Sequence, residues 1–470
     1  MRNSLLNALG IICLILAACG QSPTEAPEPF APGEFKEWAQ TPPMGWNSWD
    51  CYGPTVTEAE VKANADFMAE HLLSKGWEYV VVDIRWYVAN DKAGGYNQDD
   101  PIFTIDDHGR YMPAVNRFPS AADGSGLTHL AEYIHQRGLK LGIHLMRGIP
   151  RLAVERKLPI LGTDGITADQ IYSTDQTCTW LRDNYSVAHV PGAQEYYNSV
   201  VDLFASWGVD FIKVDDMSRP YHKGEIELMR QAIDRCGRPI VLSLSPGETP
   251  DTEAAHVREH ANMWRMVDDL WDKWEDVTHL MDVAERWYDY IQPGTWPDCD
   301  MLPFGHISIR GERGDDRTSL LTADEARSLM TFCCAFHSPL MMGGDLPTTD
   351  SLTLALLTND EVLRMHRQST GLRPLIHENG LLVLTSLQPD TGHTYIAIFN
   401  LDNRPQNLRF TPAELGLGDD DTVWQPTNLW TQQDLPQVGR TLSRRSRTFT
   451  ITLGRHACGL YLFQKTNHGQ

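Results

Sequence analysis

Eight short apolar segments recur between residues 41 and 372, separated by stretches with the hydrophobic spacing of helices. They are 44–49, 79–86, 139–146, 209–215, 239–245, 263–269, 296–302 and 339–342. Most are almost continuously apolar, which is typical of parallel strands covered on both faces. An open, doubly wound sheet is the alternative for alternating strands and helices. Eight repeats in a segment of this length favour a closed (β/α)8 TIM barrel, an α/β fold.

The segments between these strands contain helix signals. Thr57 and Glu60 form a capping box, Val61 opens a run of apolar residues at helical spacing, and Gly76 precedes the next strand. Two connections, 147–192 and 307–321, are too long to be turns. Long ordered loops at the C-terminal face of a barrel usually shape a substrate pocket.

Beyond residue 372 the hydrophobic period changes to two. Short strand patterns at 381–387, 394–400, 407–410, 448–453 and 459–464 are separated by Asn, Asp, Gly and Pro. We therefore expect residues 373–470 to form a second domain, an antiparallel β-sandwich.

The N-terminus has the pattern of a targeting segment. Arg2 precedes an apolar core, and the sequence Leu-Ala-Ala-Cys ending at Cys19 is similar to the lipobox of bacterial lipoproteins. That resemblance implies a signal peptide over 1–18, lipidation of Cys19 and anchoring to the cell envelope, in the outer membrane because Gly20 follows. Residues 19–40, rich in Pro, Glu and Ser, would form a disordered tether. An ordinary secretory signal with a chance cysteine is the alternative.

Charge and cysteine content narrow the possible partners. Acidic residues number 62 against 40 basic ones, and the net charge of −22 argues against a nucleic-acid partner and favours a neutral substrate. The nine cysteines show no zinc-ligand spacing, and removing Cys13 and Cys19 with the leader leaves seven. An odd number leaves at least one free thiol, so no disulfide framework is inferred.

Charged residues follow two of the predicted strands. Lys213, Asp215 and Asp216 end one strand, and Arg265 with the pair 268–269 ends another. Paired carboxylates at strand ends suit glycoside hydrolysis, in which one attacks the anomeric carbon and the other protonates the leaving oxygen. Lys213 shares a strand face with Asp215 and would keep it ionised. Taken singly, each carboxylate could instead be a structural ion pair or a helix cap.

Four motifs in order resemble glycoside hydrolase family 27, which contains α-galactosidases and α-N-acetylgalactosaminidases. They are Met44-Gly45-Trp46-Asn47-Ser48-Trp49, Lys213-Val214-Asp215, Trp264-Arg265 with Asp269, and Trp296-Pro297-Asp298-Cys299-Asp300-Met301-Leu302. The resemblance implies a TIM barrel, a C-terminal antiparallel domain, a retaining mechanism, and no metal or other cofactor.

The same resemblance assigns roles by position. Asp215 matches the family nucleophile and Asp269 the acid/base. The sugar-binding residues that it implies are Trp49, Asp83, His144, Lys213, Ser245, Arg265 and Asp300.

Several positions depart from the family pattern. Ile84 stands where a second aspartate follows Asp83, and His144 stands where the family has a tyrosine. Ser245 matches the residue that recognises the sugar 2-position, and its small size would admit a 2-acetamido group. Met217 replaces a cysteine that forms a disulfide in many members.

These features together predict a retaining, exo-acting α-galactosidase acting on a terminal galactose-like sugar. The same mechanism on α-N-acetylgalactosaminides or β-L-arabinopyranosides is the nearest alternative, since β-L-arabinopyranose is galactose without its C6 arm. A non-catalytic glycan-binding lipoprotein and a Mg²⁺-dependent barrel enzyme are alternatives of other classes. The oligomeric state stays open.

Overall fold

The N-terminal part of the chain is a closed barrel of parallel strands. The structure is a computed structural model that describes residues 28–389, 391–418, 422–440 and 446–466. The barrel strands are β1 (Met44–Asn47), β2 (Tyr79–Val82), β3 (Lys140–Met146), β7 (Phe211–Asp215), β8 (Val241–Leu244), β9 (Met263–Arg265), β10 (Trp296–Asp298), β11 (Met301–Leu302) and β14 (Leu340–Met342). They pair in the order β10-β9-β8-β7-β3-β2-β1-β14-β11.

Closure of the barrel depends on a strand that is split in two. β10 pairs with β9, and β11 pairs with β14 on the opposite edge. Only Cys299 and Asp300 separate the two halves, so together they occupy one strand position. Asp300 has a left-handed backbone (φ 81°), and its N–H donates to Asp298 Oδ1 at 3.0 Å. The eight predicted strand positions and the closed barrel are therefore confirmed.

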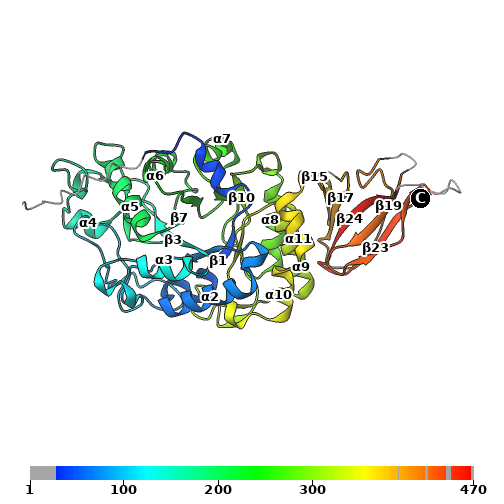
Figure 1. Cartoon of the computed structure of the whole chain (residues 1–470), viewed down its shortest axis with the longest axis horizontal. Coiled ribbons are helices and arrows are strands. Elements are labelled where there is room, and N and C mark those ends of the chain that lie inside the picture. The colour runs from blue at the N-terminus through cyan, green and yellow to red at the C-terminus, as the bar shows by residue number, and fades with distance from the viewer. Residues whose placement is uncertain (1–27, 390, 419–421, 441–445, 467–470) are drawn as a thin grey trace, which may run out of the picture.

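Helices cover the outside of the barrel (Figure 1). The helices of the described residues are α1 (Trp49–Tyr52), α2 (Glu58–His71), α3 (Thr128–His135), α4 (Arg151–Glu155), α5 (Ala193–Trp207), α6 (Lys223–Arg235), α7 (Ala254–Arg258), α8 (Trp274–Ala284), α9 (Ala323–Ala335), α10 (Ser351–Leu357) and α11 (Asp360–Gln368). The capping box at Thr57 and Glu60 is present.

The long connection after β3 contains a small sheet of its own. Strands β4 (Ile149–Pro150), β5 (Tyr172–Ser173) and β6 (Asn184–Val187) pair in the order β4-β6-β5. The connection after β11 is pinned by a short pairing of β12 (His306–Ile307) with β13 (Arg317–Thr318).

The C-terminal part is an antiparallel β domain, as predicted. Its strands are β15 (Thr370–Glu378), β16 (Leu381–Leu387), β17 (Thr394–Asn400), β18 (Gln406–Phe410), β19 (Val423–Asn428), β20 (Gln433–Asp434), β21 (Val438–Arg440), β22 (Ser446–Arg447), β23 (Phe449–Leu453) and β24 (Cys458–Thr466). The larger sheet has the order β15-β16-β17-β24-β19-β21-β22, with β20 beside β19, and β18 pairs with β23.

The larger sheet is buried on both faces. Leu382, Leu384 and Phe399 belong to the same apolar cluster as the barrel core. Their alternating neighbours, such as Val383 and Ile398, belong to a second cluster inside the β domain. Because successive side chains of a strand point to opposite faces, this double burial explains the continuous apolar run in β16.

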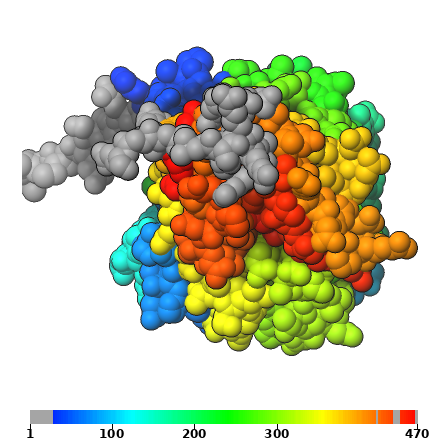
Figure 2. Space-filling view, turned by 90° about the vertical axis from the view of Figure 1, so that its right-hand side faces the viewer, coloured from blue at the N-terminus to red at the C-terminus, as the bar shows by residue number. Residues whose placement is uncertain are grey.

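Helix α9 joins the two domains. Figure 1 places it on the side of the barrel nearest the β domain, and Figure 2 looks onto that end of the molecule, with the orange and red β domain in front. Every residue from Ser328 to Ala335 is buried. Ser328 Oγ donates to the carbonyl of His456 (2.7 Å), and Trp430 Nε1 donates to Thr331 Oγ1 (3.0 Å).

Candidate active site

A cavity of about 680 Å³ opens at the C-terminal ends of the barrel strands. This is the end at which barrel enzymes carry their active sites. Six of the residues that sequence motifs singled out line it: Trp49, Asp83, Lys213, Asp215, Arg265 and Asp269. The other three, His144, Ser245 and Asp300, are buried and contact members of this group.

Asp215 ends β7 and faces the cavity. Ser245 Oγ donates to its Oδ1 at 3.0 Å, and His144 Nε2 lies 3.5 Å from its Oδ2. Burial alone would raise the pKa of Asp215, but His144, the charge of Lys213 and the Ser245 hydrogen bond outweigh it and lower that pKa to about 2. Asp215 is therefore an anion at neutral pH.

Its neighbour Asp216 is turned away from the cavity. Its backbone is left-handed (φ 63°), and its carboxylate accepts from Arg147 Nε and Nη2 at 3.0 and 2.7 Å. Arg147 also pairs with Glu225. Asp216 thus belongs to a buried ion network behind the strand ends, while Asp215 faces the cavity.

Asp83 is a buried anchor at the end of β2. Its Oδ2 accepts from Asn47 Nδ2 (2.7 Å) and pairs with Lys213 Nζ (2.8 Å), and Ser48 Oγ accepts from its backbone N–H (3.0 Å). Burial opposes ionisation, but Lys213 and His144 outweigh it and the pKa of Asp83 is lowered. His144 Nε2 lies 3.9 Å from Asp83, so this ring sits between two carboxylates.

Arg265 joins the second carboxylate to the split strand. Its Nη2 lies 3.0 Å from Asp269 Oδ1 and its Nη1 lies 2.5 Å from Asp300 Oδ1. Burial raises the pKa of Asp300, against the charge of Arg265, and the charges of Asp269 and Asp298 raise it further. The Asp269 side chain is 32% exposed and that of Asp300 only 2%, so Asp269 is the more accessible carboxylate of the two.

Asp269 is not a helix cap. β9 ends at Arg265, α8 begins at Trp274 after Lys273, and Asp269 lies in the loop between them. The next residue, Leu270, donates its N–H to Asp300 Oδ2 at 2.7 Å. This bond fixes the loop that carries Asp269 to the split strand.

Ile84 lines the cavity beside Asp83, at the position where the family pattern has a second aspartate. The following residue, Arg85, does not line the cavity. Its guanidinium makes two bonds to Asp183 (2.8 and 2.6 Å) and also contacts Asp91. The cavity wall is therefore apolar at this point.

Several lining residues were not found from the sequence. Tyr96 stacks on Trp49 with ring centroids 5.6 Å apart, and Trp180 and Glu312 also line the cavity. Burial raises the pKa of Glu312, and the charges of Asp269 and Asp215 contribute in the same direction. Trp180 and Glu312 come from the two long connections, whose length was the available signal.

Other expectations concern parts of the chain away from the cavity. Cys19 and the leader lie outside the residues that the structure describes. No helix within those residues is long and apolar enough to cross a membrane. The seven cysteines after the leader are all free thiols.

Comparisons with known proteins agree with this architecture. A family model described as alpha galactosidase A matches residues 41–153 and 181–368. A model described as the alpha galactosidase C-terminal beta sandwich domain matches residues 382–463. Among curated proteins, alpha-galactosidase 2 of Arabidopsis thaliana is 27% identical over 429 residues, covering 90% of this chain and 89% of that protein.

Two solved proteins are more similar in sequence. A family 27 β-L-arabinopyranosidase from Geobacillus stearothermophilus is 46% identical, with a TM-score of 0.88, covering 93% of this chain and 99% of that one. A putative alpha-N-acetylgalactosaminidase from Bacillus halodurans is 42% identical, with a TM-score of 0.80, covering 90% of this chain and 97% of that one. The chain is a glycoside hydrolase and belongs to glycoside hydrolase family 27, the alpha-galactosidase A family.

Proposed function

We propose that this protein is a retaining, exo-acting glycosidase that removes terminal β-L-arabinopyranosyl residues. The observation that carries the choice of sugar is Ile84, an apolar side chain in the cavity wall beside Asp83. A carboxylate there would bind a sugar hydroxyl, whereas Ile84 offers only an apolar contact. A sugar that lacks the hydroxymethyl arm of galactose has one hydroxyl group fewer that needs a hydrogen-bond partner in the cavity. The 46% identity to a β-L-arabinopyranosidase supports the same choice.

Asp215 is the proposed nucleophile. It is ionised, faces the cavity and is held by Ser245 and His144. Its Oδ oxygen attacks the anomeric carbon, the bond to the leaving oxygen breaks, and a covalent glycosyl-enzyme forms. The positive charge of Lys213 stabilises the anionic form of the nucleophile before attack.

Asp269 is the proposed acid/base. It donates a proton to the leaving oxygen in the first step, then takes one from the water that releases the sugar. Two inversions give net retention. Its place at the open side of the cavity lets the rest of the glycan extend toward solvent, while Asp83, His144 and Asp300 close the inner end.

α-Galactosides and α-N-acetylgalactosaminides are second candidate substrates, and a separate observation favours each. α-Galactosides share every ring hydroxyl with β-L-arabinopyranosides, and the matching family models carry the alpha-galactosidase description. α-N-Acetylgalactosaminides are favoured by the small Ser245 and by the 42% identity to the Bacillus halodurans protein.

A panel of three nitrophenyl glycosides separates these sugars. We expect kcat/KM to be highest for the β-L-arabinopyranoside, lower for the α-D-galactoside and lowest for the α-N-acetylgalactosaminide. A larger kcat/KM for either of the other two would overturn the proposed specificity. Proton NMR of the first-formed sugar tests the stereochemistry, and an inverted anomer would overturn the retaining mechanism.

The nucleophile is tested by Asp215→Asn with Asp216→Asn as its matched control. The first change should reduce turnover by several orders of magnitude while sugar binding survives. The second should lower stability through the Arg147 network yet leave the folded enzyme active.

We also propose that Cys19 is lipidated and holds the enzyme on the cell envelope. The proposal rests on the leader pattern alone. Metabolic labelling with a radioactive fatty acid should mark the wild type and not Cys19→Ser. Equal labelling of both would exclude Cys19 as the lipidated residue.

A further inference from the structure

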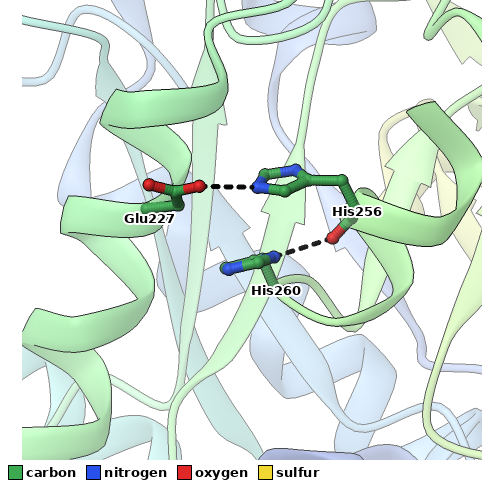
Figure 3. A group of neighbouring side chains, drawn as sticks. All are labelled: Glu227, His256 and His260. Atoms are coloured by element: carbon green, nitrogen blue, oxygen red, sulfur yellow. Dashed lines mark hydrogen bonds and ion pairs between the residues drawn. The ribbon is translucent and has the colours of Figure 1, made fainter.

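A histidine and carboxylate cluster lies on the outer helices, away from the sugar cavity. Glu227 comes from α6, His256 from α7, and His260 follows α7 (Figure 3). Glu227 Oε1 and His256 Nε2 are 3.2 Å apart, and the two imidazole rings stack with centroids at 4.0 Å. One ligand atom from each residue lies within 4.8 Å of the others. None of the three lines the cavity.

The hydrogen bond of His260 determines which of its nitrogens is free. Its Nδ1 lies 2.7 Å from the carbonyl oxygen of His256. A carbonyl only accepts, so Nδ1 must carry the proton. In the neutral ring, Nε2 then has a lone pair. Metal-binding histidines usually donate their other ring N–H to a carbonyl or carboxylate in this way.

The hydroxyl group of Tyr221 can pair with either neutral tautomer of His256, because a hydroxyl can donate or accept a hydrogen bond. The Nδ1 of His256 lies 2.7 Å from this hydroxyl. Without a cation, the hydroxyl donates to Nδ1, and Nε2–H donates to Glu227. With a cation, the hydroxyl rotates to accept from Nδ1–H, and the lone pairs of Nε2 and Glu227 both turn to the ion. A change of tautomer, with no net loss of protons, is enough for His256 to become a ligand.

We propose that Glu227, His256 and His260 bind one Zn²⁺ ion. Two imidazoles and one carboxylate are a donor set that zinc takes in tetrahedral geometry, with water as the fourth ligand. The Glu227 side chain is 41% exposed, which leaves the ion a path from solvent. The positive charge of Lys223 lies nearby and opposes the binding of a cation. Its side chain is 56% exposed, and its Nζ lies 3.9 Å from Glu253 Oε2, whose negative charge partly offsets it.

The site would connect three segments of the barrel. It holds α7 to α6 directly, and through Tyr221 it reaches the loop after β7. That loop also carries Arg219, which lines the sugar cavity and contacts Asp268 at 2.5 Å. Binding of the ion should therefore stiffen a rim of the cavity without contributing a ligand to the sugar.

Zinc titration of the purified protein after chelator treatment tests the proposal. We expect one equivalent of Zn²⁺ to bind with a dissociation constant below about 1 µM by calorimetry, because three ordered ligands are already close together. Zinc should also raise the thermal midpoint by several degrees, since an ion that binds only the folded state stabilises it. Binding weaker than about 100 µM, or a stoichiometry near zero, would overturn the assignment.

Matched variants identify the ligands. His260→Ala and Glu227→Gln should each weaken zinc binding at least 10-fold and abolish the thermal shift. His129→Ala is the control, because His129 is an exposed histidine beside Asp123 and Glu132 that lies outside the cluster. Retained glycosidase activity and an unchanged circular dichroism spectrum would show that His260→Ala is folded. If folded His260→Ala binds zinc as the wild type does, the site is elsewhere and the proposal fails.

If zinc-site variants lose zinc but His260→Ala is misfolded, X-ray absorption of the zinc-loaded wild type decides the question. Two imidazole nitrogens, one carboxylate and one water around the ion are expected. A shell with sulfur or with only oxygen ligands would refute the site.

Discussion

Removal of the Ser245 hydroxyl should move the acid limb of the pH profile upward. In the wild type, Ser245 Oγ donates to Asp215 Oδ1 at 3.0 Å, and the pKa of Asp215 is lowered to about 2. A hydrogen bond to a charged group contributes about 1.5–3 kcal/mol. Ser245 is 1% exposed, so little of this is lost to solvent screening.

The size of the shift follows from that bond. One pKa unit corresponds to about 1.4 kcal/mol, so Ser245→Ala should raise the pKa of Asp215 by about one to two units. The nucleophile must be ionised, so activity falls as pH drops through its pKa. The half-maximal point of kcat/KM on the acid side should therefore move from about pH 2 to about pH 3–4. His144 and Lys213 still favour the anion, which limits the shift.

The assay is kcat/KM against pH from about 1.5 to 7, with nitrophenol read after an alkaline quench. Circular dichroism at each pH, and recovery of activity at pH 6, separate titration from unfolding. Ser243→Ala is the matched control, because Ser243 lies in β8, just before Ser245, and is also buried, yet no hydrogen bond joins it to Asp215 in the described part of the chain. Superimposable acid limbs for Ser245→Ala and wild type would refute the reasoning, as would an equal shift in Ser243→Ala.

Three further predictions concern specificity, stability and sugar contact. Ile84→Asp should raise the galactoside to arabinopyranoside ratio of kcat/KM by about 10-fold or more, the value of one charged hydrogen bond; an unchanged ratio would remove Ile84 from specificity. Asp183→Asn should lower the free energy of unfolding in urea by about 3 kcal/mol or more, because it leaves the buried Arg85 charge poorly compensated; a loss below about 1 kcal/mol would contradict this. Trp49→Ala should raise KM more than it lowers kcat, since it removes the aromatic wall that stacks on Tyr96; an unchanged KM would exclude Trp49 as a sugar contact.

The barrel strands could be predicted because each is a compact apolar run. Their ends were less well defined: the segment 79–86 was predicted as one strand, yet β2 stops at Val82, and the next two residues, Asp83 and Ile84, line the cavity. In the β domain, β19 was missed. Pro426 lies inside it, and proline normally argues against a strand interior. β19 pairs with β24 on one side and with β20 and β21 on the other, and this pairing keeps the segment extended.

Some residues of the candidate site could likewise be predicted from the sequence, and others could not. Lys213 and Asp215 could be placed because two residues on one strand share a face, so the geometry is local. The stacking of Tyr96 on Trp49 joins segments 47 positions apart and depends on how a loop folds back. The Glu227 cluster also comes from separate helices. Contacts of this kind leave no periodic signal in a single sequence.

Helix α9 and the sheet beside it make the two domains energetically one body. A sheet with an apolar core on each face cannot be detached from the barrel without exposing both α9 and its own side chains, including the contact of Phe332 with Phe399. Truncation near residue 370 should therefore yield an insoluble barrel rather than a smaller enzyme. Heat and urea should melt the whole protein in a single cooperative transition. Recombining this barrel with the β domain of another family member would require the surface of α9 to be exchanged as well.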